Sequence, residues 1–141
     1  MEVLTRKMRI SVLWLTMAVA MSAHMALSIF EPGVIKLITI GDMRMTEGEF
    51  IFSAIYAWLI PLTMAFLSVT LKDSTNRSAN IILGIVLTVG NISHLLFEQL
   101  AQPSIHMAQP SVHQLLLNCS TVAATSLVVW YSWKWPKHRE A

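Results

Sequence analysis

Apolar residues gather in four long blocks along the chain, and short polar or proline-bearing segments separate these blocks. The blocks span roughly residues 10–30, 50–71, 79–101 and 112–133. Each is close to the roughly 20 residues that an α-helix needs to cross about 30 Å of hydrocarbon. The pattern therefore predicts an all-α, polytopic membrane protein. Residues 1–141 should form a single domain, an antiparallel bundle of four transmembrane helices.

The segments between the blocks predict where the helices end. Glu31-Pro32-Gly33 should end the first helix, because proline disfavours a helical residue before it and glycine permits a turn. Residues 34–40 are apolar and fit a short helix or a strand on the membrane surface, so the conformation of residues 34–48 is left open. Pro61 should kink the second helix. The short connection 72–78 makes the second and third helices antiparallel neighbours.

Basic residues are distributed unevenly between the two sides that this topology defines. Eight of the ten Lys and Arg residues lie before the first block, between the second and third, or after the fourth. Only Lys36 and Arg44 fall on the other side. Because Lys and Arg are enriched in cytoplasmic loops, both termini and the middle connection are predicted to be cytoplasmic. A chain that is 55% hydrophobic and 13% charged has membrane lipids as its expected partners and no nucleic acid.

Three smaller features bear on processing, redox chemistry and helix packing. The first block lacks a small-x-small cleavage site, so we expect it to be retained as a signal anchor. Cys119 is the single cysteine, which excludes an internal disulfide, and it is expected to be a buried, inert thiol. Small residues recur at Ala18, Ser22 and Ala26, a spacing that favours close helix contact and is compatible with a homo-oligomer.

Amide and ionisable side chains inside the blocks are the main functional clue. Asn91, His94 and Glu98 are spaced three and four residues apart, so they share one face of the third helix. His24 of the first helix is predicted to lie at a similar depth, in the outer half of the membrane, since both histidines follow the start of their helix by about 15 residues. Ionisable side chains at depth cost on the order of 2.5 to 3.5 kcal/mol and usually face the bundle interior or water.

Several interpretations of this polar group stay open from the sequence. His94, Glu98 and Asn91 could simply hydrogen-bond one another and fix the helix packing. They could instead form an outward-facing pocket, with His24 opposite, that binds a small apolar or amphipathic molecule or relays protons. A lipid- or sterol-modifying enzyme that uses the His94 and Glu98 pair for acid–base chemistry is an alternative, as is a non-catalytic partner subunit. The sequence does not decide whether the protein is an enzyme.

The same residues are also candidate ligands for a metal ion or a haem. His24 and His94 could ligate a haem axially, or join Glu98 around a transition metal. However, the chain has no Glu-x-x-His pair, no His-Glu-x-x-His and no Cys-x-x-Cys-His. The sequence therefore predicts no cofactor and no metal site, while leaving the question of a bound haem or metal open.

Three segments give the chain a family resemblance: "SVLWLTMAVAMSAHMALSIFEPG", "IPLTMAFLSVTLKDSTNRSANII" and "YSWKW". They resemble small bacterial and archaeal four-helix membrane proteins that share a domain of unknown function. The best-matching parts are Leu13-Trp14, Pro32-Gly33, Leu67-Ser68, and Asn76-Arg-x-Ala-Asn80. The resemblance implies the four-helix topology and a location in a bacterial or archaeal cell membrane, and it implies no activity.

A second, local resemblance concerns the segment "HLLFE", which carries His94 and Glu98. It is similar to the intramembrane His-x-x-x-Glu of the emopamil-binding sterol isomerases, whose helical fold encloses a sterol pocket. The resemblance implies that His94 and Glu98 could move a proton at a double bond.

Overall fold

The structure is a computed structural model that describes residues 2–30, 34–40, 46–101 and 112–135, without the side chains of residues 37 and 97–101. All regular secondary structure in these ranges is helical, which confirms the predicted all-α class. The elements are α1 (Glu2–Ser28), α2 (Val34–Thr39), α3 (Glu47–Ala54), the π-helix η1 (Ile55–Leu59), α4 (Ile60–Thr70), α5 (Asp73–Ala101) and α6 (Val112–Trp133).

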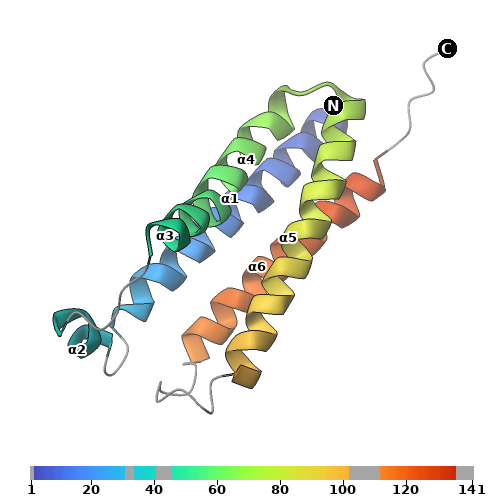
Figure 1. The fold of residues 1–141 in the computed structure, drawn as a ribbon. Helices are drawn as coiled ribbons and strands as arrows, with labels where there is room; N and C mark the ends of the chain where they lie inside the picture. Colours follow the sequence, from blue (N-terminus) through green and yellow to red (C-terminus); the bar gives the residue numbers. More distant parts are fainter. Residues whose placement is uncertain (1, 31–33, 41–45, 102–111, 136–141) are drawn as a thin grey trace.

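Four helical segments of the described chain are long and apolar enough to cross a membrane. They are α1, the continuous run from α3 through η1 to α4, α5 as far as Leu96, and α6. Figure 1 shows these segments as a bundle in which consecutive spans are antiparallel. The start of α1, the α4–α5 turn and the end of α6 lie at one end, which we call the terminal end. We call the opposite end the far end.

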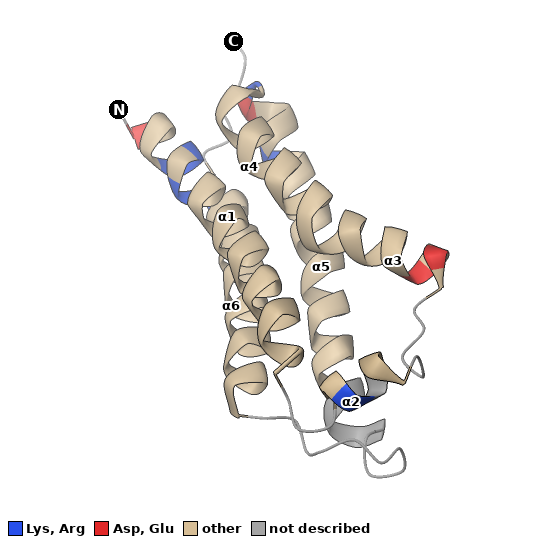
Figure 2. Ribbon diagram, turned by 90° about the vertical axis from the view of Figure 1, so that its left-hand side faces the viewer, with Lys and Arg blue, Asp and Glu red and all other residues tan. Residues whose placement is uncertain are grey.

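The bundle is held mainly by α1 and α6. Helix α1 packs extensively against both α6 and α4, and α6 also packs against α5, whereas α4 and α5 share a much smaller contact. Figure 2 shows α3 diverging from α5 toward the far end. Among the described residues, α3 packs on η1 of its own span and makes no extensive contact with α1, α5 or α6. The bundle is thus tight at the terminal end and more open between α3 and α5.

The distribution of polarity is inverted relative to that of a water-soluble protein. Large apolar side chains such as Val19, Phe66 and Leu116 are about two-thirds exposed on the outer surface of the bundle. Among the described residues, the buried polar side chains are Ser68, Asn76, Asn80, Asn91, Gln114, Asn118, Thr121, Thr125 and Ser132. A hydrocarbon solvent favours this arrangement, because apolar groups lose nothing by facing lipid while polar groups need partners. The fold is that of a multi-pass membrane protein.

The second span deviates from a regular α-helix just before Pro61, where the sequence predicts a kink. The deviation takes the form of the π-helix Ile55–Leu59, in which the N–H of Ile60 donates to the carbonyl of Ile55. Pro61 is buried and has no N–H to donate to the preceding turn, so the backbone ahead of it widens by one residue instead of breaking. The span remains continuous, and α3 continues from η1 toward the far end.

Three observations correct or complete predictions made from the sequence. The predicted connection 72–78 is mostly helical, because α5 already begins at Asp73, whose carboxylate lies in its first turn and suits the positive end of the helix dipole. Val34–Thr39, which fitted a helix or a strand, is a short helix. The prediction of a buried Cys119 is wrong, because this thiol is exposed on the outer surface of α6.

Near the terminal end, four buried side chains from three helices form a hydrogen-bonded network that we call the terminal layer: Trp14, Ser68, Asn76 and Asn80. The Asn80 Oδ1 atom accepts from Trp14 Nε1 at 2.6 Å and from Ser68 Oγ at 3.2 Å. Its Nδ2 donates to the side-chain and main-chain oxygens of Asn76. Asn76 Nδ2 donates in turn to the carbonyl of Ser68 at 2.6 Å. Every amide group of the two asparagines is therefore satisfied, and α1, α4 and α5 are fixed in register.

An apolar layer separates the terminal layer from the far half. It contains Met17, Met64, Leu87 and Val128, each of which is almost completely buried. Gly84 allows α5 to approach α6 closely, because a Cβ atom at this position would lie 2.8 Å from Val129 Cγ2. The contact also sets the antiparallel register of α5 and α6, which positions the side chains of the far half.

Replacing Asn80 tests the terminal layer. We expect Asn80→Leu to lower the free energy of unfolding by about 2–4 kcal/mol, because the buried Trp14 Nε1 and Ser68 Oγ donors both lose their acceptor. The measurement is thermal unfolding in mild detergent, followed by tryptophan fluorescence. Thr75→Leu, at an exposed position of the same helix, is the control and should change little. Equal stability of Asn80→Leu and wild type would show that the network does not support the fold.

Candidate functional site

Two of the four predicted site residues meet in the far half of the bundle. The ring of His24 on α1 lies edge-on to the ring of His94 on α5, with 6.1 Å between the ring centroids and an interplanar angle of 80°. His24 is half-buried and His94 is more exposed. The similar depth that we predicted for the two histidines is therefore accompanied by direct contact between their rings.

Asn91 lies one turn before His94 on α5 and is 5% exposed. Its Oδ1 accepts a hydrogen bond of 2.6 Å from the hydroxyl of Tyr56 on η1. Its Nδ2 is buried and has no hydrogen-bond partner within the described part of the chain. This amide therefore differs from Asn76 and Asn80, whose groups are all satisfied. We call His24, Tyr56, Asn91 and His94 the far layer.

The backbone of η1 and a glycine of α5 position Tyr56 for this contact. Tyr56 lies in the π-helical turn, and its ring stacks on Phe52 of α3 at a centroid distance of 5.9 Å. A Cβ atom on Gly90 would lie 2.8 Å from the Tyr56 hydroxyl oxygen. Only a residue without a side chain leaves room for the hydroxyl there. Tyr56 thus joins the second span to α5 in the far half, as Ser68 does at the terminal end.

The inner face of α6 adds polar groups that the sequence analysis did not single out. Gln114, Asn118, Thr121 and Thr125 are each more than nine-tenths buried, and they recur with helical spacing. Because Gly84 lies against Val128 and Val129, antiparallel counting along α5 and α6 puts Asn91 level with Thr121 and His94 level with Asn118. The regular spacing of polar residues in an apolar span was the available signal for this face.

A further hydrogen bond joins α1 to the second span at the same end. Trp58 Nε1 of η1 donates to Ser22 Oγ at 2.8 Å. Ser22 lies just ahead of His24, so the contact fixes the part of α1 that carries the imidazole. The π-helix thereby supplies one side chain to α5, through Tyr56, and one to α1, through Trp58.

Glu98 and the other ionisable groups at the far end are not part of the far layer as the described residues show it. Glu98 belongs to α5, one turn beyond His94, and its side chain lies outside the described residues. Glu49 caps α3, where its carboxylate accepts from the backbone N–H of Thr46 at 2.8 Å. His113 is half-buried at the start of α6. The described residues contain no group of three His, Cys, Asp or Glu side chains that could hold a metal ion.

These groups can recognise a molecule that carries a hydrogen-bond acceptor. The unmatched Asn91 Nδ2 can only donate, and a neutral imidazole donates through one nitrogen and accepts through the other. The outer surface of the bundle is apolar, so a molecule that reaches these groups from the lipid would need apolar groups as well. Two adjacent imidazoles are also the usual groups for proton transfer near neutral pH.

Comparisons of the chain with protein-family models, with curated proteins and with solved structures give no match. The resemblances to four-helix membrane proteins of unknown function and to sterol isomerases remain predictions from the sequence.

A double-mutant cycle tests the contact between Tyr56 and Asn91. Tyr56→Phe removes the hydroxyl and leaves the buried Oδ1 of Asn91 without its donor, so we expect the free energy of unfolding to fall by about 1–3 kcal/mol. In combination with Asn91→Leu, the two losses should not add, and the coupling free energy should be about 0.5–1.5 kcal/mol. Thermal unfolding of the purified variants in one detergent gives all four values. Strict additivity would contradict the hydrogen bond.

Proposed function

We propose that the far layer binds a small amphipathic molecule whose oxygen acceptor hydrogen-bonds to Asn91 Nδ2. The observation that carries this proposal is the buried Asn91 amide, which is satisfied at Oδ1 by Tyr56 and unmatched at Nδ2 among the described residues. A buried donor without a partner costs about 1–3 kcal/mol, and a bound molecule or an ordered water is the usual reason that a native protein tolerates one. The neighbouring histidines supply further polar contacts for the same molecule.

The contrast between the two polar layers supports a ligand. In the terminal layer, the same residue type is fully satisfied by its own chain through four side chains. The bundle can therefore supply every hydrogen-bond partner of a buried asparagine where only stability is required. A buried asparagine whose Nδ2 has no hydrogen-bond partner among the described residues, and which lies next to two imidazoles, is more typical of a binding site than of a structural contact.

In the described part of the far half, the second span and α5 share no extensive contact along α3. Helix α3 diverges from α5 toward the far end (Figure 2). An apolar or amphipathic molecule dissolved in the bilayer could enter between these helices without crossing the tightly packed terminal end. Entry from the bilayer also suits a site whose polar groups lie inside a bundle with an apolar outer surface.

Charge distribution supports an orientation in which the far layer faces away from the cytoplasm. Figure 2 shows Lys and Arg gathered mainly at the terminal end, and Lys36 lies on α2. By the enrichment of basic residues on the cytoplasmic side, we place both termini in the cytoplasm of a bacterial or archaeal cell. In this orientation, a ligand reaches the site from the outer half of the membrane.

Native mass spectrometry of gently extracted protein tests the proposed site. We expect wild type to retain a small molecule that is lost in Asn91→Leu and weakened in His94→Ala and Glu98→Gln, with folded yield nearly unchanged in the last two. Ser93→Ala, at an exposed position of the same helix, should retain the molecule and serves as control. An equal adduct in Asn91→Leu, or no adduct in wild type, would contradict the proposal. The same spectra report whether the chain forms a homo-oligomer.

A proton relay is a second candidate function, carried by the ring contact between His24 and His94. In vesicles loaded with a pH-sensitive dye, wild type should dissipate an imposed pH gradient faster than empty vesicles do. His24→Gln and His94→Gln should reduce the rate to that of empty vesicles, because each removes a group that takes up and releases protons. His113→Gln, which changes a histidine outside the pair, should leave the rate unchanged. Equal rates in wild-type and empty vesicles would exclude this function.

A further inference from the structure

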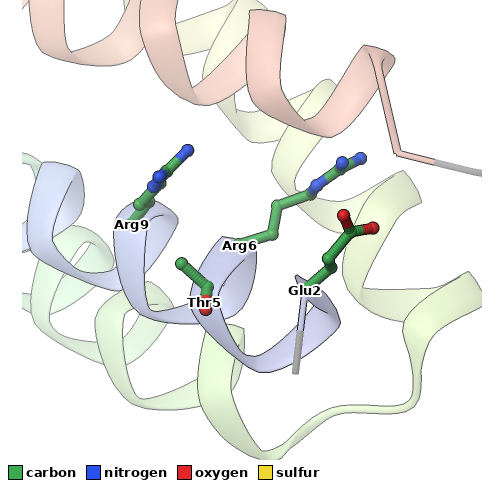
Figure 3. Close-up of a pocket in the computed structure, with 4 residues that line it drawn as sticks. All are labelled: Glu2, Thr5, Arg6 and Arg9. Carbon is green, nitrogen blue, oxygen red and sulfur yellow. The ribbon is translucent and has the colours of Figure 1, made fainter.

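A hollow of about 350 Å³ lies at the terminal end, far from the candidate site. It is lined by Glu2, Thr5, Arg6 and Arg9, which recur with helical spacing along one face of α1. Figure 3 shows the side chains of Arg6 and Arg9 projecting from the same side of α1 toward α6, with the Glu2 carboxylate on the Arg6 side of the hollow. Two guanidinium groups and one carboxylate thus line the hollow.

The charged groups differ in how they are held. Arg6 is fixed by α6, because its Nη1 donates to the main-chain oxygen of Lys134 at 2.6 Å. Within the described ranges, Arg9 and Glu2 take part in no hydrogen bond or ion pair. One guanidinium is therefore pre-positioned, while a second guanidinium and a carboxylate remain available to a ligand.

The hollow lies at the level of lipid headgroups. Helix α1 has 27 residues and is about 40 Å long, so it exceeds about 30 Å of hydrocarbon by roughly two turns. The first turns, which carry the hollow, therefore extend into the headgroup region. At the same end, the exposed Trp130 and Trp133 of α6 form an interfacial aromatic anchor, with Lys134 Nζ 4.0 Å from the centre of the Trp130 ring.

An apolar strip continues from the hollow toward the far end. Val12 and Val19 follow Arg9 on α1 at helical spacing, and both are more than half exposed. A headgroup seated among the charged side chains would therefore place its acyl chain along this strip. A soluble ligand would have no use for such a surface, which favours a lipid as the occupant.

We propose that the hollow binds the headgroup of an amino-phospholipid of the phosphatidylethanolamine type. Arg6 and Arg9 bind the phosphate, because guanidinium groups form charge-assisted hydrogen bonds with phosphate oxygens in a matching geometry. Glu2 binds the ammonium group, which a purely anionic lipid lacks. A headgroup with both charges matches all three side chains, whereas an anionic headgroup such as phosphatidylglycerol would bring no partner for the carboxylate. This site is independent of the far layer.

Competition between lipids tests the proposal. Purified full-length protein, stripped of lipid in detergent, is mixed with phosphatidylethanolamine, phosphatidylglycerol and phosphatidylcholine of identical acyl chains, and the retained lipid is counted by native mass spectrometry. We expect wild type to prefer phosphatidylethanolamine. Arg9→Gln should weaken its retention about fivefold, as the loss of one basic contact near a phosphate implies. Glu2→Gln should remove the preference for phosphatidylethanolamine over phosphatidylglycerol.

Control variants and a soluble competitor separate this site from general charge effects. Lys72→Gln removes an exposed basic residue at the same end that does not line the hollow, and it should leave the preference unchanged. O-phosphoethanolamine carries the same charges without acyl chains and should displace the lipid only weakly. Preference for phosphatidylglycerol in wild type, an unchanged preference in Glu2→Gln, or displacement by equal concentrations of O-phosphoethanolamine would each overturn the proposal. Because Arg9 makes no contact that holds the fold, a misfolded variant is not the expected outcome.

Discussion

The fold depends on one constraint: a polar group inside hydrocarbon must find its partner within the protein. Asn80 shows how this constraint becomes structure. One amide accepts from Trp14 of α1 and Ser68 of α4 while it lies on α5, so three helices are held by a single side chain. The apolar outer surface cannot hold helices together in this way, because lipid competes equally well for apolar contacts. Specific packing therefore comes from the polar interior.

The two polar layers both contain buried asparagines, but they differ in how completely these side chains are hydrogen-bonded. The hydrogen bonding of the terminal layer is complete, since its two asparagines bond to each other, to a serine and to a tryptophan. The far layer is left incomplete at Asn91 Nδ2, and it contains two imidazole rings in edge-on contact. Between them, Met17, Met64, Leu87 and Val128 form an apolar layer that separates the two networks. The fully hydrogen-bonded layer and the layer that we propose as a binding site thus lie at opposite ends of one small bundle.

Depth along a helix could be predicted from the sequence, whereas the direction that a side chain faces could be predicted only in part. Counting residues from the helix starts put His24 and His94 at one level, and the structure brings their rings together. The tyrosine that bonds to Asn91 could not be found this way, because its direction depends on the π-helical turn ahead of Pro61. Nothing in the sequence pairs Trp14 with Asn80. Only tertiary packing joins them across 66 positions of sequence.

The π-helical turn also makes the second span adjustable. An α-helix rotates about 100° per residue, and η1 accommodates one residue more than an α-helical turn would. Deleting one residue there would restore the α-helical repeat and rotate α3 by about 100° about its own axis, while α4 kept its packing on α1. A different face of α3 would then be directed toward the bundle interior. A single-codon change in length could therefore alter the lining of the far half without rebuilding the scaffold.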